Sequence, residues 1–302
     1  MQDFQEILSE ARKCNTPKIA VAVAQDEDVL LGLDEAVKAN LVEPILVGDG
    51  EEISAMASKL QIDISSYQLI DIPDKLLAVK EAVALVHKGK AELLMKGMIG
   101  TAELLKAILD KEIGLRLWKV LSHVAVMKLK NYHKFLLITD AGINIELDLD
   151  RKVHIINNAI QVAKVLNIKK PKVVPLAAVE VINPNMQATI DAAALSKMCE
   201  RGQIKDCIID GPLAFDNAIS LEAAQHKGIT SSVAGDADIL LAHNIEAGNL
   251  MYKSFVYLAE AKTAGIVVGA KVPIVVTSRS DSSETKLYSI ALGVLMASRQ
   301  AN

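Results

Sequence analysis

Short apolar runs alternate with amphipathic segments along almost the whole chain. Runs of β-branched and aliphatic residues predict buried strands at Lys18–Ala24, Ile45–Val47 and Phe135–Thr139. Apolar residues at helical spacing predict helices over residues 28–39, 51–60, 75–87, 149–166 and 186–198. Such alternation is typical of βαβ units around a mostly parallel sheet that is covered on both faces, so the pattern predicts an α/β fold.

Further apolar runs end in polar loops. They predict strands at residues 91–95, 173–179, 207–209, 239–242 and 272–276, and most of these run into loops rich in Asp, Asn, Glu, Ser or Gly. In open α/β sheets, ligands bind beyond the carboxyl ends of the strands. The position of these polar loops therefore favours an enzyme.

Length and composition narrow the class of protein. A chain of 302 residues suits one large domain or two of roughly 150 residues each. A net charge of −4 gives no reason to expect nucleic acid or a membrane surface as partner, and no segment approaches the roughly 20 apolar residues of a membrane span. The first residues do not resemble a signal peptide. Three cysteines without CxxC spacing indicate a reducing cytoplasm and no disulfide framework.

The segment VPIVVTSRSDSSETKLYSIAL, residues 272–292, carries the strongest chemical signal. Its strand ends in hydroxyl side chains and Arg279, and Asp281, Ser282 and Ser283 are all good N-caps for a helix over residues 283–299. Such a turn directs backbone N–H groups and the positive end of a helix dipole at an anion, and Arg279 adds a planar donor fork. A well-capped surface turn without a ligand explains the same residues.

A second strand-to-helix turn is KGMIGT, residues 96–101. Gly97 and Gly100 allow a ligand to approach the backbone, Thr101 can cap the following helix, and Lys96 supplies positive charge. The Walker A pattern is absent, so this turn is either a phosphate cradle or an ordinary βα connection.

Three other loops contain polar candidates with a structural alternative each. TDAGINIELDLD, residues 139–150, holds four carboxylates that bind a divalent metal or, more simply, cap the next helix. DGPLAFDNA, residues 210–218, offers Asp210, Asp216 and Asn217 for a substrate or for the turn itself. The loop over residues 243–249 offers His243, Asn244 and Glu246. We predict no metal site, and neither a GxSxG elbow nor an activated cysteine supplies a covalent nucleophile.

Taken in order, six segments resemble the phosphate acetyl/butyryltransferases, most closely the butyryltransferase branch. They are KGMIGTAELLKAIL, LITDAGINIELDLDRKVHIINNAI, PKVVPLAAVEVINPNM, DGPLAFDNAIS, GDADILLAHNIEAGNLMYKS and VVTSRSDSSETKLYSIAL. The resemblance implies conversion of acyl-CoA and phosphate to acyl phosphate and CoA, with no metal, no cofactor and no covalent enzyme intermediate. It also implies homo-oligomers, and two α/β domains of the isocitrate/isopropylmalate dehydrogenase type with an active site in the cleft between them. By this resemblance domain I covers residues 1–127 and 268–302, and domain II covers residues 128–267.

The resemblance also assigns roles to residues. Ser278 matches the serine that hydrogen-bonds the CoA sulfur, and Arg279 matches the arginine that polarises the acyl carbonyl. Where the acetyltransferases carry an aspartate as proposed base, this chain has Thr285 beside Glu284, so Glu284, Asp281 and another residue remain candidates. We expect the substrates to be bound by Lys96, Gly97, Gly100, Thr101, Asp281, Ser282, Asp210, Asn244 and Glu246.

Two alternatives share this architecture. A metal- and NAD-dependent dehydrogenase would need converging aspartates such as Asp140, Asp210 and Asp236, but no dinucleotide fingerprint is present. A non-catalytic CoA-binding regulator would keep the fold, and the retained Ser278–Arg279 pair argues against it.

Overall fold

A computed structural model describes residues 1–278 and 280–300 of the chain. The chain divides into two compact units. The central unit comprises Val120–Thr263 with Met1–Asp3, and the terminal unit comprises Phe4–Lys119 with Ala264–Asn302. The domain boundaries expected after residues 127 and 267 stay a prediction, because compact units need not be independent folding domains.

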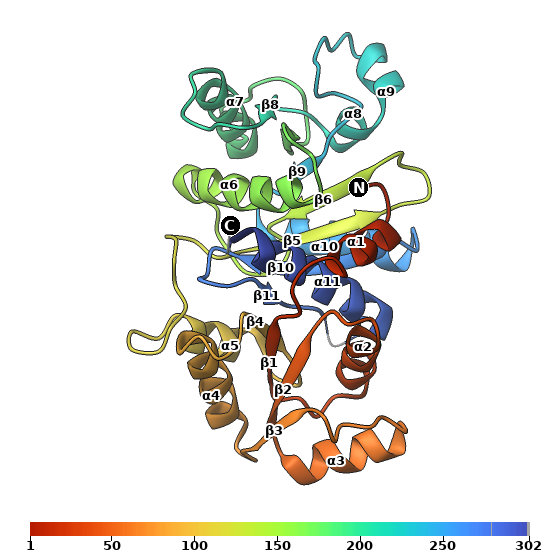
Figure 1. Ribbon diagram of the computed structural model, residues 1–302. Helices are drawn as coiled ribbons and strands as arrows, with labels where there is room; N and C mark the ends of the chain where they lie inside the picture. The colour runs from red at the N-terminus through yellow and green to blue at the C-terminus, as the bar shows by residue number, and fades with distance from the viewer. Residues whose placement is uncertain (279, 301–302) are drawn as a thin grey trace. The chain divides into compact units, whose positions relative to one another are not determined.

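In the described part of the terminal unit, the strands follow the order β3 (Gln68–Asp71), β2 (Glu43–Gly48), β1 (Lys18–Ala22), β4 (Leu93–Lys96), β11 (Ile274–Val275) and β10 (Lys262–Val268). Neighbouring strands are parallel except for the antiparallel pair of β11 and β10. Strand β11, near the end of the chain, thus completes a sheet begun by β1. Figure 1 shows β1 and β2 in red and orange beside the blue C-terminal elements.

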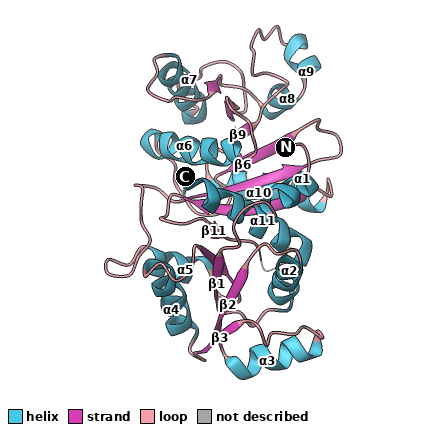
Figure 2. Cartoon of the chain, in the orientation of Figure 1, coloured by secondary structure: helices cyan, strands magenta, loops and turns pink. Residues whose placement is uncertain are grey.

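The helices of this unit, within the described residues, are α1 (Phe4–Ala11), α2 (Glu27–Lys38), α3 (Gly50–Lys59), α4 (Lys75–His87), α5 (Thr101–Ile108) and α11 (Ser283–Gln300). Aspartates at the N-caps of α2, α3 and α4 each accept a backbone N–H, which fixes where these helices begin. Helix α11 packs against α1 and α2, and α4 packs against β1 and α5. The alternation of strand and helix is visible in Figure 2.

The central unit has five strands in the order β5 (Ser122–Lys128), β6 (Phe135–Thr139), β9 (Ile239–Leu241), β7 (Lys172–Pro175) and β8 (Ile208–Ile209). All pairs are parallel except β5 with β6. The unit's helices are α6 (Leu149–Val165), α7 (Gln187–Glu200), α8 (Phe215–Ile219), α9 (Leu221–His226) and α10 (Ile245–Tyr257). Met251 and Phe255 of helix α10 are partly buried and pack against an apolar core that includes Leu136 and Leu240.

The predicted α/β class is confirmed, but three predicted strands are shorter than expected by two residues or more. Strand β7 ends at Pro175 rather than at Val179, and the apolar residues that follow line a cavity instead of extending the strand. Strand β1 ends at Ala22, because Val23 adopts a positive φ of 61° and turns the chain. Strand β11 covers only Ile274–Val275 of the predicted run.

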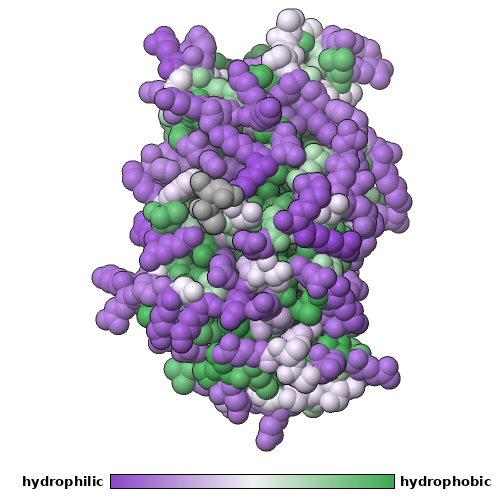
Figure 3. Space-filling view, viewed as in Figure 1, coloured by the Kyte–Doolittle hydropathy of each residue, from purple (hydrophilic) through white to green (hydrophobic). Residues whose placement is uncertain are grey.

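The surface seen in Figure 3 is mainly hydrophilic, with apolar side chains in small groups. Within residues 1–278 and 280–300, no helix combines the length and the hydropathy that a membrane crossing requires.

Candidate functional site

The turn between β11 and α11 is held by its own side chains. Asp281 is buried, and its Oδ2 accepts the backbone N–H of Ser278 at 2.7 Å. The Ser278 hydroxyl lies 3.1 Å from the Ser280 hydroxyl, and the Ser282 hydroxyl accepts the backbone N–H of Thr285 at 3.3 Å in the first turn of α11. Asp281 and Ser282 therefore shape the turn that presents Ser278, whether or not they also touch substrate.

The other predicted catalytic residues are Glu284 and Arg279. Glu284 is exposed in the first turn of α11, and its Oε1 accepts the Tyr288 hydroxyl at 2.7 Å. Arg279, predicted to polarise the carbonyl, lies outside the described residues. Its role, like those of Ser278 and Glu284, stays a prediction.

The KGMIGT turn after β4 interlocks with the end of β1. The backbone N–H groups of Gly97 and Met98 donate to the carbonyls of Ala22 and Val23 at 2.9 and 2.7 Å. A Cβ on Gly97 would lie 2.0 Å from the Val23 carbonyl oxygen, so this position requires glycine for packing alone.

The KGMIGT turn differs from a simple phosphate cradle in the contacts of its lysine and in the start of its helix. Lys96 is buried, and its Nζ donates to the carbonyls of Gly97 and Ile99 at 3.2 and 3.1 Å. Helix α5 starts at Thr101, with Gly100 at its N-cap and no side-chain cap. Substrate binding by Lys96, Gly97, Gly100 and Thr101 stays a prediction. Lys96 and Gly97 already donate hydrogen bonds within the protein, and Gly100 is the N-cap of α5.

In the central unit, the carboxylates expected from the sequence do not converge. Asp140 is fully buried, and its Oδ1 accepts the N–H groups of Gly142 and Ile143 in its own loop. Asp236 binds Lys134 and Lys172 at 2.8 and 2.6 Å.

Two further carboxylates of these loops also have local partners. Asp210 accepts the N–H of Gly211 at 2.9 Å, and Asp148 caps α6. Among the described residues, no three His, Cys, Asp or Glu side chains form a group that could hold a metal ion.

A polar cavity of about 560 Å³ opens at the carboxyl ends of β6 and β9. Two of the predicted substrate residues, Asn244 and Glu246, line it together with His243. Asn244 also caps α10, because its Oδ1 accepts the N–H of Ala247 at 2.9 Å. The other lining residues are Ile145, Glu146, Leu147, Asp148, Arg151 and Gln187.

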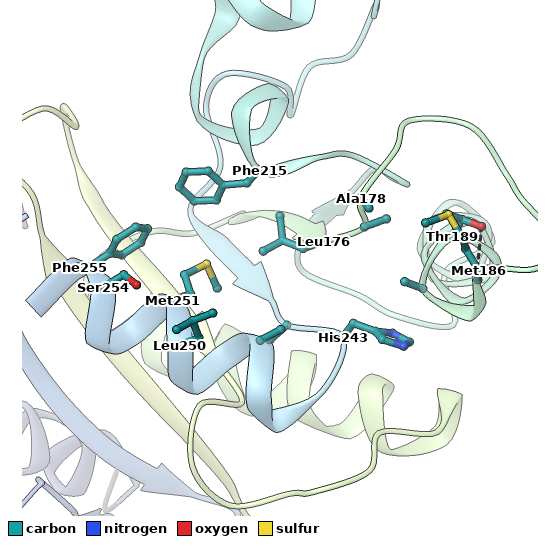
Figure 4. Close-up of a pocket in the computed structure, with 14 residues that line it drawn as sticks. Leu176, Ala178, Met186, Thr189, Phe215, His243, Leu250, Met251, Ser254 and Phe255 are labelled. Atoms are coloured by element: carbon teal, nitrogen blue, oxygen red, sulfur yellow. Dashed lines mark hydrogen bonds between the residues drawn. The ribbon is translucent and has the colours of Figure 1, made fainter. Parts of the chain in front are cut away.

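A second, apolar cavity of about 540 Å³ lies beyond β7 and β9. Its lining residues are Leu176, Ala177, Ala178, Met186, Ala188, Thr189, Phe215, Ala242, His243, Ala247, Leu250, Met251, Ser254 and Phe255. Figure 4 shows Phe215 and Phe255 at one end of this cavity and His243 with Met186 towards the other. His243 lines both cavities.

His243 is held by a buried ion pair that the sequence did not reveal. Lys152 of α6 is buried, and its Nζ donates to Asp191 of α7 at 2.5 Å and lies 3.1 Å from His243 Nδ1. The other Asp191 oxygen accepts the Gln187 side-chain amide at 2.8 Å. Because a lysine ammonium only donates, His243 Nδ1 accepts, and a neutral imidazole then carries its proton on Nε2.

The same surroundings favour the neutral form of His243. Burial lowers its pKa below the usual 6.5, and the positive charge of Lys152 lowers the pKa further, while Asp191 opposes this effect. A neutral imidazole with a fixed N–H is thus placed where the apolar and polar cavities meet.

A signal for Lys152 was present in the sequence. Lys152 falls on the apolar stripe of α6, three, four and seven residues before the buried Ile155, Ile156 and Ala159. A lysine on a buried helical stripe requires a partner, because an unpaired buried charge is costly. The sequence does not say which carboxylate fulfils that need.

The cysteine pair of the central unit is not a candidate nucleophile. The Sγ atoms of Cys199 and Cys207 lie 3.8 Å apart. Burial, together with Cys199, raises the pKa of Cys207 to about 12, so its thiol stays protonated near neutral pH.

The lowered pKa of His243 predicts how stability responds to acid. Below about pH 6.5 the unfolded chain binds a proton at this residue that the folded chain resists, so His243 contributes stability that is lost as the pH falls. We expect His243→Asn, which keeps an acceptor for Lys152 but does not titrate, to lose less stability than the wild type on acidification. Urea denaturation midpoints between about pH 7 and pH 5 measure this loss. The exposed His226→Asn is the control, and a wild-type-like acid loss in His243→Asn would contradict the assignment.

The profile of the family described as phosphate acetyl/butaryl transferase matches residues 3–81 and 75–294. The chain is 50% identical over 298 residues to a phosphate butyryltransferase of Clostridium beijerinckii, covering 99% of each chain. It is 46% identical to a phosphate acetyltransferase of Thermotoga maritima, covering 97% of this chain and 100% of the relative.

Solved structures agree with the sequence comparison. A branched-chain phosphotransacylase from Enterococcus faecalis V583 superposes with a TM-score of 0.81 at 33% identity, covering 93% of this chain and 98% of the other. A 4-hydroxythreonine-4-phosphate dehydrogenase from Burkholderia phymatum superposes with a TM-score of 0.54 at 15% identity over 93% and 98% of the two chains, a likeness of fold alone. The chain therefore belongs to the phosphate acetyl/butaryl transferase family.

Proposed function

We propose that the chain transfers a short acyl group, butyryl-like in size, between CoA and inorganic phosphate. The observation that carries the proposal is the 50% identity to a phosphate butyryltransferase over nearly the whole of both chains. The reaction converts acyl-CoA and phosphate to acyl phosphate and CoA, and in both directions the acyl carbonyl carbon is the centre that is attacked.

The proposed chemistry needs no covalent enzyme intermediate. In the direction that consumes acyl phosphate, the CoA thiolate attacks the acyl carbonyl carbon, a C–S bond forms, and the C–O bond to phosphate breaks. Holding both substrates in register supplies much of the rate, because it replaces a bimolecular encounter. Negative charge develops on the carbonyl oxygen, and a donor fixed there stabilises it most.

Ser278 and Arg279 are the residues proposed to act on these atoms. Ser278 would hold the CoA sulfur, and its fixed backbone supports this role, because Asp281 anchors its N–H. Arg279 would donate to the carbonyl oxygen. Phosphate would be bound by the N-terminal amides of α11, near the Ser282 cap, with the Lys96–Thr101 turn contributing.

Glu284 is the proposed proton acceptor for the thiol. Its hydrogen bond from Tyr288 orients the carboxylate without neutralising it. A base is needed for only part of the flux, because a thiol of pKa about 8.5 is already a few per cent thiolate at neutral pH.

The direct test is thiol release from acetyl-, butyryl-, isobutyryl- and longer acyl-CoAs in the presence of phosphate. We expect release that depends on phosphate, favours short chains and persists in a strong chelator. Activity that requires a divalent metal and NAD instead would support a dehydrogenase, and binding of CoA without any release would support a regulator.

Arg279→Ala tests the proposed carbonyl donor. Loss of one such donor is expected to lower kcat about 100-fold or more, with a smaller change in KM, because the contact strengthens in the transition state. Steady-state kinetics with the preferred acyl-CoA measure this effect, and Arg299→Ala, a change in the last turn of α11, is the control. Near-normal turnover of Arg279→Ala would exclude the role.

We also propose a homodimer or larger homo-oligomer in the cytoplasm. Exposed apolar side chains at the end of α10 support association, since Tyr257 is 63% and Leu258 is 84% exposed. The free cysteines of the described chain suit a reducing compartment. Light scattering should give at least twice the 32.5 kDa mass of one chain, and a monomer at micromolar concentration would contradict the assembly.

A further inference from the structure

The apolar cavity of the central unit and its polar neighbour meet at a single side chain, His243. Both cavities open where parallel strands end, which is the usual position of ligands in α/β sheets. One cavity is lined mainly by alkyl and aromatic groups, and the other by charged and amide groups. A ligand that spans His243 would therefore need an apolar part on one side and a polar part on the other.

The lining of the apolar cavity leaves little for a polar ligand to bind. Apart from His243, its side chains with polar atoms are Thr189 and Ser254. The Thr189 hydroxyl lies 3.0 and 2.8 Å from the carbonyls of Asn183 and Met186, and it accepts the Asn183 N–H at 2.9 Å. Its hydrogen-bonding capacity is thus used within the protein.

The cavity also has room for a short chain. Five of its lining residues are alanines, which keep the walls open: Ala177, Ala178, Ala188, Ala242 and Ala247. A volume of about 540 Å³ falls within the range of small-molecule sites. Burial of each methylene from water is favourable, so an apolar wall distinguishes chains by length.

The boundary between the cavities is rigid. Lys152 and Asp191 fix the His243 ring from α6 and α7, and Asn244, the next residue, caps α10. His243 is here a positioning residue, because it divides the two cavities at a fixed point. When the apolar part of a ligand begins at His243, the length of that part decides how far it extends into the apolar cavity.

We propose that the apolar cavity receives the acyl chain of the substrate, with the polar remainder on the Asn244 and Glu246 side of His243. This assignment rests on the proposed function, which supplies a substrate of that shape. It makes Ala247 and Leu250, one helical turn apart on the cavity side of α10, determinants of chain length.

Two variants test the assignment in opposite directions. Ala247 and Leu250 are both exposed, so replacing them should leave the fold intact. Ala247→Leu fills the cavity and is expected to lower kcat/KM for butyryl-CoA relative to acetyl-CoA by roughly tenfold, the usual effect of a methylene-sized mismatch. Leu250→Ala enlarges the cavity and is expected to raise kcat/KM for hexanoyl-CoA relative to that for butyryl-CoA.

Matched controls place the same changes on exposed helix positions of the terminal unit, Ala55→Leu in α3 and Leu77→Ala in α4. Both should keep the wild-type ratios, and melting curves check the fold of all four variants. Wild-type ratios in Ala247→Leu and Leu250→Ala would overturn the assignment.

The same experiment distinguishes a wrong acyl-chain assignment from a wrong proposed function. If the kcat/KM ratios stayed unchanged and the variants had a lower mass by light scattering, the apolar cavity would be assigned to contact with a second copy of the chain. That result would overturn the acyl-chain assignment. If the wild type released no thiol from any acyl-CoA, the proposed function itself would fail, and this assignment would fall with it.

Discussion

Parallel strand pairing is the constraint on which both units depend. Parallel neighbours cannot be joined by a tight hairpin, so each connection crosses a face of the sheet, and most of them carry a helix. The loops that leave the carboxyl ends consequently gather at one edge, while the faces are buried. Residues as far apart in sequence as Leu176 and His243 come to line one cavity because β7 and β9 are parallel neighbours.

In both units, the polar side chains have two kinds of role. Some are committed to the protein itself: Asp281 holds the Ser278 backbone, and Asp148 caps α6. Others, such as Asn244, cap a helix and face a cavity at the same time. The same residue types therefore serve turn geometry and ligand binding together, and the sequence alone does not separate the two uses.

The limits of sequence reasoning are physical and can be seen in particular elements. Helix α4 and strand β6 have the bounds predicted for them. Strand β6 is a continuous apolar run that is buried along its whole length, and the Asp74 cap fixes the start of α4. Strand β3 was missed, since Gln68–Asp71 lies at the sheet edge, mostly exposed, and has no apolar pattern.

The site shows the same limit. Asn244, Glu246 and His243 are close in sequence, and their grouping could be predicted from one loop. The Lys152–Asp191 pair and the apolar cavity could not, because they depend on which helices and strands become neighbours. Pairing partners follow from topology, which a local pattern does not contain.

The position of β11 has a consequence for synthesis of the chain. Strand β4 ends at Lys96, but its neighbour β11 begins at Ile274, so residues Val120–Thr263 of the central unit leave the ribosome between them. The central unit is then able to fold first, while β4 keeps an unpaired edge that exposes backbone hydrogen-bonding groups. A nascent chain of this protein therefore carries an incomplete sheet for most of its translation, and synthesis of β11 and α11 is the step that completes the fold.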